Sequence, residues 1–526
     1  MFVLPLVSCS TLRWIESNRF LRRDPMTEPT SAARYRNPII DADVPDPDAI
    51  RVGDVYYLVA SSFNRAPGLP VLASTDLVNW EIVSHAVAGN TPQAWFAQPR
   101  HGAGVWAPSI RHHDGLFHIV YPDPDQGVFV VSAADARGPW SAPRLLLPGL
   151  GVIDPCPLWD DDGATYLVHG WARSRAGRKN VLSIVPVDAA LTAVVGPSRD
   201  VVDGDAIDGC VTLEGPKLYK RDGWYWILAP AGGVATGWQY AFRARGPYGP
   251  YEERVVLAQG DTPVNGPHQG AWVETADGAH WFLHFQDRGV FGRVLHLQPM
   301  HWGDDGWPVL GDQGRPVLEH ASPQGAPQGP RTLARGDGFP DGLPGAQWAW
   351  QANPDGGWLL PEPGCLRIVA GVDAGNLRTL PRVIGQPLPG VPSTMAVSLS
   401  LEGPAGTRAG AGVLGLDYLW AGLRRTAEGD RLVVATRHRD EPGETVRHDE
   451  AAPAGSVRLA LSCDADGEIA VAVREPGGDR ALPVRFRAAE GQWIGAEYVL
   501  FAATGAAQHA TARFADVEID VRDGRR

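Results

Sequence analysis

Cysteine is scarce in this chain of 526 residues. The five cysteines, Cys9, Cys156, Cys210, Cys365 and Cys463, lie far apart, and no two form a CxxC pair. An odd, scattered set offers no disulfide framework and no set of metal ligands, and it favours a reducing compartment. We therefore expect a cytoplasmic protein, with a periplasmic protein or a lipoprotein as the alternative.

Long apolar runs are also missing, so we expect no membrane-spanning segment. The first residues, "MFVLPLVSCS", resemble a lipoprotein signal that ends at Cys9, but their apolar part is short and no positive residue precedes it. Met26 offers an alternative start. We predict that residues 1–36 are an N-terminal extension, either disordered or the product of a misassigned start.

The chain has no basic stripe and no Lys-rich tail, and the net charge is −13 at pH 7. This balance argues against nucleic acid as a partner. The chain is longer than a single hydrophobic core normally supports, so two domains are expected. The chain has 19 Trp but only 4 Met, which favours stacking surfaces for ring-shaped ligands as well as core packing.

Helical periodicity is almost absent, and a β-rich pattern recurs instead. Five copies have a short apolar stretch, a Gly-Asp or Asp-Gly turn, and an alternating aromatic strand; they begin at Asp46, Ala107, Asp154, Glu214 and Gln269. Asp-Gly between two alternating runs predicts a hairpin. A repeat of roughly 50–60 residues has room for about four strands, so we predict a five-bladed β-propeller over residues 37–315.

Three of the repeats begin with a carboxylate: Asp46, Asp154 and Glu214. Equivalent positions in a closed ring of blades face one axial funnel, so these side chains should converge. A turn is the alternative reading for Asp46, which lies between Pro45 and Pro47. Convergence is the stronger reading, because three like charges forced together are costly and a fold does not need them for stability.

Paired carboxylates in unlike environments are the machinery of glycoside hydrolysis. Glu214 follows an apolar residue in "VTLEGPKLY", which suits a general acid. Asp46 is held between two prolines, which suits a fixed general base. Asp154 would keep the pKa of the acid raised and orient it. A separation that leaves room for water predicts inversion at the anomeric carbon.

Several motifs resemble glycoside hydrolase family 43. They are "NPIIDADVPDPDAIRVGDVYYLVASSF" (37–63), "GVWAPSIRHHDGLFHIVY" (104–121), "IDPCPLWDDDGATYLVHG" (153–170), "LEGPKLYKRDGWYWI" (213–227) and "FGRVLHLQPMHW" (291–302). The resemblance implies a five-bladed propeller and an inverting mechanism. It places the base on Asp46, the pKa-modulating aspartate on Asp154 and the acid on Glu214.

The resemblance also implies roles for two residues late in the propeller. His268 is similar to a histidine that lies under the pocket near a structural calcium or a water cluster, so it is a candidate substrate or metal contact. Arg293 matches an arginine that touches the sugar. No cofactor is expected, and the resemblance makes a structural Ca²⁺ in the propeller channel the candidate metal.

Phe63 and Trp106 flank repeat strands and are candidate sugar platforms. Packing between blades is the alternative, because large aromatics in a propeller commonly serve that purpose. Both readings stay open at the level of the sequence.

The second half begins with residues 316–336, which are rich in Pro, Gly and Gln and predict a linker. Turn signals every ten or so residues then predict a β-sandwich over 337–523. Its opening resembles the concanavalin-like C-terminal domain of one branch of family 43 β-xylosidases. We expect a structural role for it, including a loop that closes the propeller pocket.

These features together predict an exo-acting glycosidase that removes terminal pentoses from xylan-derived oligosaccharides, with β-D-xylosidase first. An α-L-arabinofuranosidase and an endo-arabinanase are the enzymatic alternatives. A non-catalytic carbohydrate-binding propeller is the alternative of another class, and the three intact acids count against it. The expected partner is an oligosaccharide, and a homo-oligomer is left open.

Overall fold

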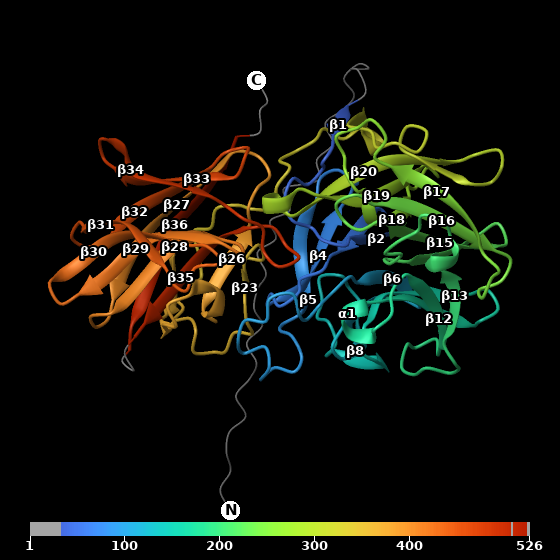
Figure 1. Ribbon diagram of the computed structural model, residues 1–526, viewed down its shortest axis with the longest axis horizontal. Helices are drawn as coiled ribbons and strands as arrows, with labels where there is room; N and C mark the ends of the chain where they lie inside the picture. Colours follow the sequence, from blue (N-terminus) through green and yellow to red (C-terminus); the bar gives the residue numbers. More distant parts are fainter. Residues whose placement is uncertain (1–32, 506–508, 523–526) are drawn as a thin grey trace, which may run out of the picture.

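The computed structural model describes residues 33–505 and 509–522, and it folds into two β-rich parts that lie side by side (Figure 1). The helical elements are short: α1 (Arg173–Ala176), η1 (Gly204–Ala206), η2 (Gly289–Phe291), η3 (Pro323–Gly325) and η4 (Leu377–Thr379). Across the described ranges, no helix is long and apolar enough to cross a membrane. The predictions for Cys9 and Met26 lie outside the described residues. The predicted all-β class, with a propeller-type part followed by a sandwich, is confirmed.

The N-terminal part contains five four-stranded antiparallel sheets, each formed by consecutive strands. The first two sheets comprise β2 (Asp48–Val52), β3 (Val55–Val59), β4 (Gly68–Ser74) and β5 (Glu81–Val87), then β6 (Ser109–His113), β7 (Leu116–Asp123), β8 (Gly127–Ala133) and β9 (Arg144–Pro148). The third comprises β10 (Val152–Trp159), β11 (Thr165–Trp171), β12 (Val181–Val187) and β13 (Arg199–Asp203). The last two comprise β14 (Lys217–Arg221), β15 (Trp224–Ala231), β16 (Trp238–Ala244) and β17 (Glu252–Ala258), then β18 (His268–Glu274), β19 (His280–Asp287), β20 (Arg293–Trp302) and β21 (Pro308–Leu310).

The first hairpin of every sheet is closed by one of the predicted turns. At Asp114-Gly115 both residues have positive φ, 49° and 77°, and at Asp222-Gly223 the values are 51° and 71°. Such turns match the twist of the flanking strands, which is why Asp-Gly is favoured there. His113 then pairs directly with Leu116 across the hairpin.

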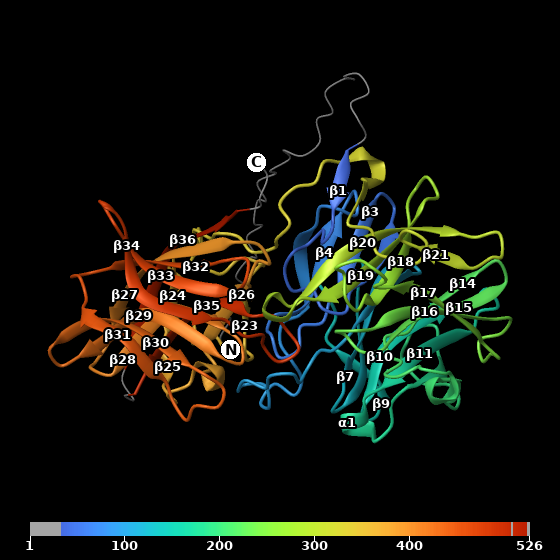
Figure 2. The same ribbon diagram turned by 45° about the horizontal axis from the view of Figure 1, so that its top comes forward.

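The five sheets close into a ring, which forms the blue-to-green half of the molecule in Figure 2. The first strand of the last sheet, β18, contacts β2, and β2, β6, β10 and β14 follow one another around the centre. An apolar cluster fills each gap between neighbouring sheets; in one, the rings of Tyr57 and Phe117 meet edge-on at 5.0 Å. The beginnings of the first strands therefore gather at one end of the axis.

Residues 316–336, predicted as a linker, lie against the first sheet. Their strand β22 (Glu319–Ala321) pairs with β1 (Arg34–Arg36), which falls inside the predicted N-terminal extension. Further along, Gln324 donates a hydrogen bond to the Tyr56 hydroxyl at 3.3 Å, and the Gly329 N–H donates to the Asn79 side chain at 2.6 Å. Proline and glycine here exclude long regular elements but not packing.

The C-terminal part is a sandwich of two sheets. One contains β23 (Ala349–Trp350), β25 (Gly371–Val372), β26 (Val383–Pro387), β28 (Thr407–Leu414), β29 (Tyr418–Thr426), β30 (Gly429–Arg437), β31 (Thr445–Ala451) and β35 (Glu497–Thr504). The other contains β24 (Cys365–Val369), β27 (Ser393–Glu402), β32 (Val457–Cys463), β33 (Glu468–Glu475), β34 (Gly478–Arg487) and β36 (Thr511–Val521). The core between them includes Trp348, Leu419, Leu459 and Leu500.

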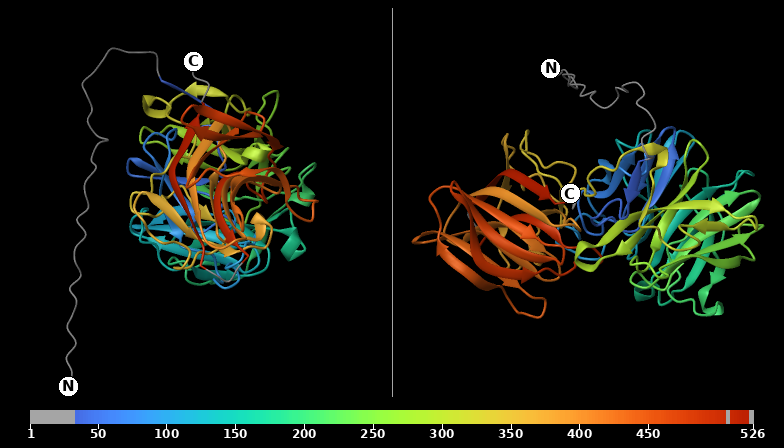
Figure 3. Two further views of the ribbon diagram at one scale, coloured as in Figure 1. Left: turned by 90° about the vertical axis from the view of Figure 1, so that its left-hand side faces the viewer. Right: turned by 90° about the horizontal axis from the view of Figure 1, so that it is seen from above.

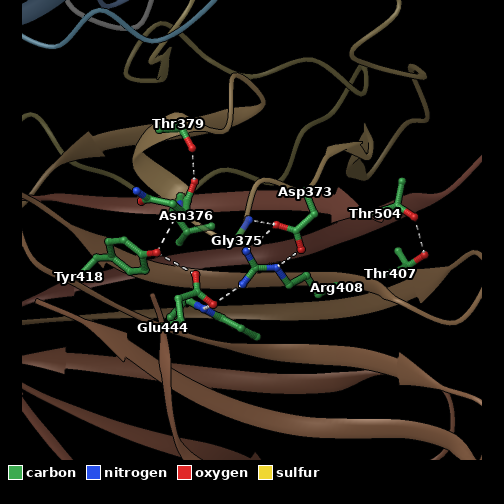
Figure 4. A network of polar contacts seen from close by, with 11 residues as sticks. Asp373, Gly375, Asn376, Thr379, Thr407, Arg408, Tyr418, Glu444 and Thr504 are labelled. Atoms are coloured by element: carbon green, nitrogen blue, oxygen red, sulfur yellow. Dashed lines mark hydrogen bonds and ion pairs between the residues drawn. The ribbon is translucent and has the colours of Figure 1, made fainter. Parts of the chain in front are cut away.

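The outer face of the larger sheet is also covered. Successive residues of a strand point to opposite faces, so Trp420 and Val433 lie on the outer face, beneath the segment that contains η4. Figure 4 shows the polar network that fastens this segment. The Arg408 guanidinium donates to both oxygens of Asp373, at 2.7 and 2.8 Å, and also to Glu444, which accepts from the Tyr418 hydroxyl at 2.8 Å.

The two parts abut directly, as the view from above in Figure 3 shows. Arg65 of the propeller and Glu497 of the sandwich form a buried ion pair. Nearby, the Asn353 side chain accepts from the Asn90 N–H at 2.7 Å and donates to the Asn90 carbonyl at 2.8 Å. Buried polar pairs of this kind fix the orientation of one part on the other.

Candidate active site

A cavity of about 300 Å³ lies at the end of the ring where the first strands begin. All seven residues predicted from the sequence line it: Asp46, Phe63, Trp106, Asp154, Glu214, His268 and Arg293. The volume is at the lower end of the range for small-molecule sites, about 300–1,000 Å³. The structure therefore brings the carboxylates at the starts of three repeats into one pocket, as the repeat pattern predicts.

Asp46 is anchored through both carboxylate oxygens. The Ser61 hydroxyl donates to Oδ2 at 2.6 Å, and the Arg293 guanidinium donates to Oδ1 at 2.6 Å. The backbone N–H of Arg293 in turn donates to Asp43 at 2.7 Å, so the arginine is itself fixed. Only 6% of Asp46 is exposed, and its charge is compensated by Arg293.

Asp154 lies within β10 and bridges the third and fourth sheets. Its Oδ2 accepts from the Gly215 N–H at 2.8 Å, next to Glu214 in the chain. Burial raises the pKa of Asp154, and the charge of Asp46 raises it further, whereas the Gly215 N–H opposes the shift. Asp154 thus holds the residue after Glu214 and acts on Glu214 through its charge.

The backbones of Asp46 and Asp154 are both left-handed, with φ of 54° and 56°. A non-glycine residue in this region costs about 1–3 kcal/mol, although aspartate tolerates it better than most residues. At both positions a costly backbone conformation therefore directs an aspartate side chain into the cavity. The cost supports a functional reason for the arrangement.

Glu214 faces the cavity with 27% of its side chain exposed. Its backbone N–H donates to the Pro230 carbonyl at 3.1 Å, which fixes the loop before β14. Burial raises the pKa of Glu214, and the charges of Asp154 and Asp46 raise it further, while Arg293 and Lys179 oppose the shift. Glu214 is therefore the carboxyl group best suited to carry a proton near neutral pH.

His268 lies beneath Glu214, with its Nε2 3.5 Å from Glu214 Oε1. It is 1% exposed, and burial lowers its pKa to about 3, so the imidazole is neutral. Among residues 33–505 and 509–522, no group of three or more His, Cys, Asp or Glu side chains is placed to hold a metal ion. A structural Ca²⁺ near His268 stays a prediction from the resemblance.

Four aromatic side chains line the cavity, those of Phe63, Trp106, Trp171 and Trp493, and three of them form a row of ring contacts. The Phe63 and Trp106 centroids are 6.4 Å apart and those of Trp106 and Trp493 are 6.3 Å apart, both edge-on. Phe63 is buried, whereas Trp106 is half-buried and donates from its indole N–H to the Gly102 carbonyl at 2.9 Å. Phe63 and Trp106 therefore combine inter-sheet packing with cavity lining.

Trp493 belongs to the C-terminal part, on the loop between β34 and β35, and was not identified from the sequence. It has φ of 65°, is 48% exposed and lines the cavity. The sequence signal was a tryptophan between glycines in "EGQWIGAEY". That signal marks an aromatic on a turn, but only the docking of the two parts brings it to the pocket. Ser61, Arg173 and Lys179 were also missed.

A ring of sheets that brings three carboxyl groups in unlike environments into one axial cavity is the arrangement expected of a glycoside-hydrolysing enzyme. The family model "Glycosyl hydrolases family 43" matches residues 35–308, and that of the "Beta xylosidase C-terminal Concanavalin A-like domain" matches residues 336–520. The chain therefore belongs to glycosyl hydrolases family 43, which confirms the resemblance and the class of enzyme.

Relatives agree with this assignment, and solved structures share the fold. A Xylanibacter ruminicola protein, provisionally named a beta-xylosidase, is 38% identical over 376 residues, which cover 70% of this chain and 69% of that protein. A non-reducing end alpha-L-arabinofuranosidase of Bacteroides ovatus is 31% identical and covers 64% of each chain. The structure of a xylan beta-1,4-xylosidase from Bacillus halodurans has a TM-score of 0.82 at 23% identity, covering 92% of this chain and 99% of that one.

Proposed function

We propose that this chain is an inverting exo-glycosidase that removes terminal pentoses from xylan-derived oligosaccharides, with β-D-xylosidase as its main activity. The observation that carries the proposal is the difference between two carboxyl groups in one cavity. Asp46 is paired with Arg293, whereas the pKa of Glu214 is raised by burial and by its acidic neighbours. The beta-xylosidase names of relatives support xylose as the sugar.

In this mechanism Asp46 accepts a proton from a water molecule as that water attacks the anomeric carbon. The bond between the anomeric carbon and the glycosidic oxygen breaks, and Glu214 delivers its proton to the leaving oxygen. Water enters opposite the leaving group, so the configuration inverts. Asp154 forms no bond and keeps the acid protonated through its charge.

The exo mode is supported by the limited size of the cavity and by Trp493, which closes one side of it from the C-terminal part. An endo-arabinanase would need a cleft that a polymer can cross. The arabinofuranosidase alternative is favoured by one observation, the name of the Bacteroides ovatus relative. The non-catalytic alternative does not account for the raised pKa of Glu214.

The test compares the hydrolysis of an aryl β-D-xylopyranoside and an aryl α-L-arabinofuranoside, with Asp46→Asn as the inactive control. We expect the higher kcat/KM on the xyloside and α-xylose as the first product in a time-resolved NMR spectrum. A higher kcat/KM on the arabinofuranoside would reassign the sugar. Release of β-xylose would reject inversion, and no hydrolysis of any pentoside would favour a binding protein.

A further inference from the structure

A basic segment borders the cavity in a chain whose net charge is −13. Residues 171–180, "WARSRAGRKN", connect β11 to β12 through α1 and contain four cationic side chains. Within this segment, Trp171, Arg173, Lys179 and Asn180 line the cavity together with Glu214. Positive charge is therefore concentrated at the pocket of an otherwise acidic protein.

Two of the four cations are held by carboxylates outside the cavity. Arg175 pairs with Asp125 at 3.1 Å, and Arg178 pairs with Asp200 at 2.7 Å. Their guanidinium groups also lie over the faces of cavity-lining tryptophans, Arg175 at 5.5 Å from the ring of Trp106 and Arg178 at 4.8 Å from that of Trp171. The charges of these two arginines are therefore compensated by carboxylates, and their side chains help to pack the wall of the cavity.

The other two cations, Arg173 and Lys179, have no such carboxylate partner among the described residues. Both are exposed and line the cavity, and in the described part of the chain no carboxylate lies within ion-pair distance of either. Lys179 donates one weak hydrogen bond to the Thr212 hydroxyl at 3.3 Å, which places it close to Glu214 along the loop before β14. Two cations thus face the pocket with their charges uncompensated.

Their position has a cost for the proposed acid. The charge of Lys179 lowers the pKa of Glu214, against the effect of Asp154. A lysine that only filled space at this rim would favour loss of the catalytic proton. An anionic group on the bound ligand would neutralise that charge when the acid is needed, and so remove the cost.

The acid protonates the leaving oxygen, so the side of the cavity next to Glu214 receives the leaving sugar. We propose that Arg173 and Lys179 form a carboxylate-binding subsite there, and that the enzyme prefers oligosaccharides whose leaving sugar carries a uronic acid branch. This inference rests on the proposed function. Guanidinium and ammonium groups bind carboxylates through charge-assisted hydrogen bonds.

The test uses xylotriose, xylotriose with glucuronic acid on its middle xylose, and the methyl ester of that branched sugar. The acid and the ester carry the same branch and differ in its charge, and xylotriose is the unbranched reference. We expect wild type to cleave the acid about fivefold faster in kcat/KM than the ester, the size expected of one or two solvent-exposed ion pairs. Added salt should reduce the ratio, because the cations are exposed.

The double variant Arg173→Gln and Lys179→Gln should reduce the acid-to-ester ratio to about one, while the ester is still cleaved. Arg175→Gln removes the same charge from the same segment at a site paired with Asp125, and it should keep the ratio. Equal kcat/KM on acid and ester in wild type would overturn the inference while leaving the pentosidase intact.

Failure to cleave xylotriose would instead reject the proposed function, and a second measurement then decides the subsite. Calorimetric binding of the acid and its ester to Asp46→Asn requires no turnover. Tighter binding of the acid, lost on Lys179→Glu, supports the subsite, and equal affinities reject it.

Discussion

Each part of the molecule buries a cluster of charged groups, and the two clusters are built in opposite ways. In the propeller, Asp46, Asp154 and Glu214 share one cavity, and Arg293 is the cation bonded to one of them. In the sandwich, Arg408 is bound on one side by both oxygens of Asp373 and on the other by Glu444. One cluster gathers like charges, and the other pairs opposite ones.

The difference indicates what each cluster is for. Neighbouring carboxylates raise one another's pKa and lower the stability of the fold, so selection for folding alone would not keep them together. Opposite charges with complete hydrogen bonds fix a unique packing, and here they fasten the segment around η4 to the sheet (Figure 4). Removing a propeller acid should therefore cost activity, and removing Arg408 should cost stability.

The largest expected effect is on the propeller side. Glu214→Gln should lower kcat/KM on xylobiose by about 10²–10⁴-fold, because the leaving oxygen loses its proton donor. Aryl xylosides with good leaving groups should lose less, since they need little protonation. The thermal midpoint should not fall, because the change replaces a carboxyl group whose ionised form its acidic neighbours disfavour with a neutral amide of the same shape. Equal losses on both substrates would contradict the role of Glu214 as the proton donor. A clear loss of stability would contradict the expected difference between the two clusters.

Arg408→Met should have the opposite profile. It removes the buried guanidinium and leaves the half-buried carboxylates of Asp373 and Glu444 without their cation, which costs about 3 kcal/mol in the free energy of unfolding of the C-terminal part. Calorimetric melting should show the loss, while kcat of the folded enzyme stays near wild type. Arg424→Met is the matched control, because its pair with Asp449 is partly exposed and should cost about 1 kcal/mol or less.

Trp493→Ala tests a point where the sandwich reaches the pocket. The ring meets Trp106 edge-on, and such a contact contributes about 0.5–1.5 kcal/mol beyond burial. We expect KM to rise up to about tenfold with kcat changed little and stability nearly unchanged, because 48% of the residue is exposed. A fall in kcat with constant KM would show that the sandwich acts on the chemical step instead.

The sequence reveals the propeller cavity more readily than the sandwich because its signals are local. Asp46, Asp154 and Glu214 each begin a repeat whose turn and strand can be recognised within about twenty residues. Trp493 and Arg408 depend on contacts between distant segments, such as Arg408 with Asp373 and Glu444, which no periodicity encodes. Residues 316–336 show the same limit, because composition predicts irregular backbone but not the surface against which it packs.

The smallest expected effect is a shift in pH dependence on Asp154→Asn. Burial and the charge of Asp154 raise the pKa of Glu214, so removing that charge should lower this pKa. The acid then loses its proton at lower pH, and the basic limb of kcat/KM against pH should move to lower pH by about one unit. Asparagine can still accept from the Gly215 N–H, so the loop before β14 should keep its position.

The control for this shift is Asp162→Asn, which removes a carboxylate from the exposed turn between β10 and β11 of the same sheet. Its pH profile should match that of wild type. A basic limb that stays in place for Asp154→Asn, with lower activity at every pH, would mean that Asp154 acts through its hydrogen bond to Gly215 and not through its charge. The propeller cluster would then resemble the sandwich network in using its carboxylate to hold structure.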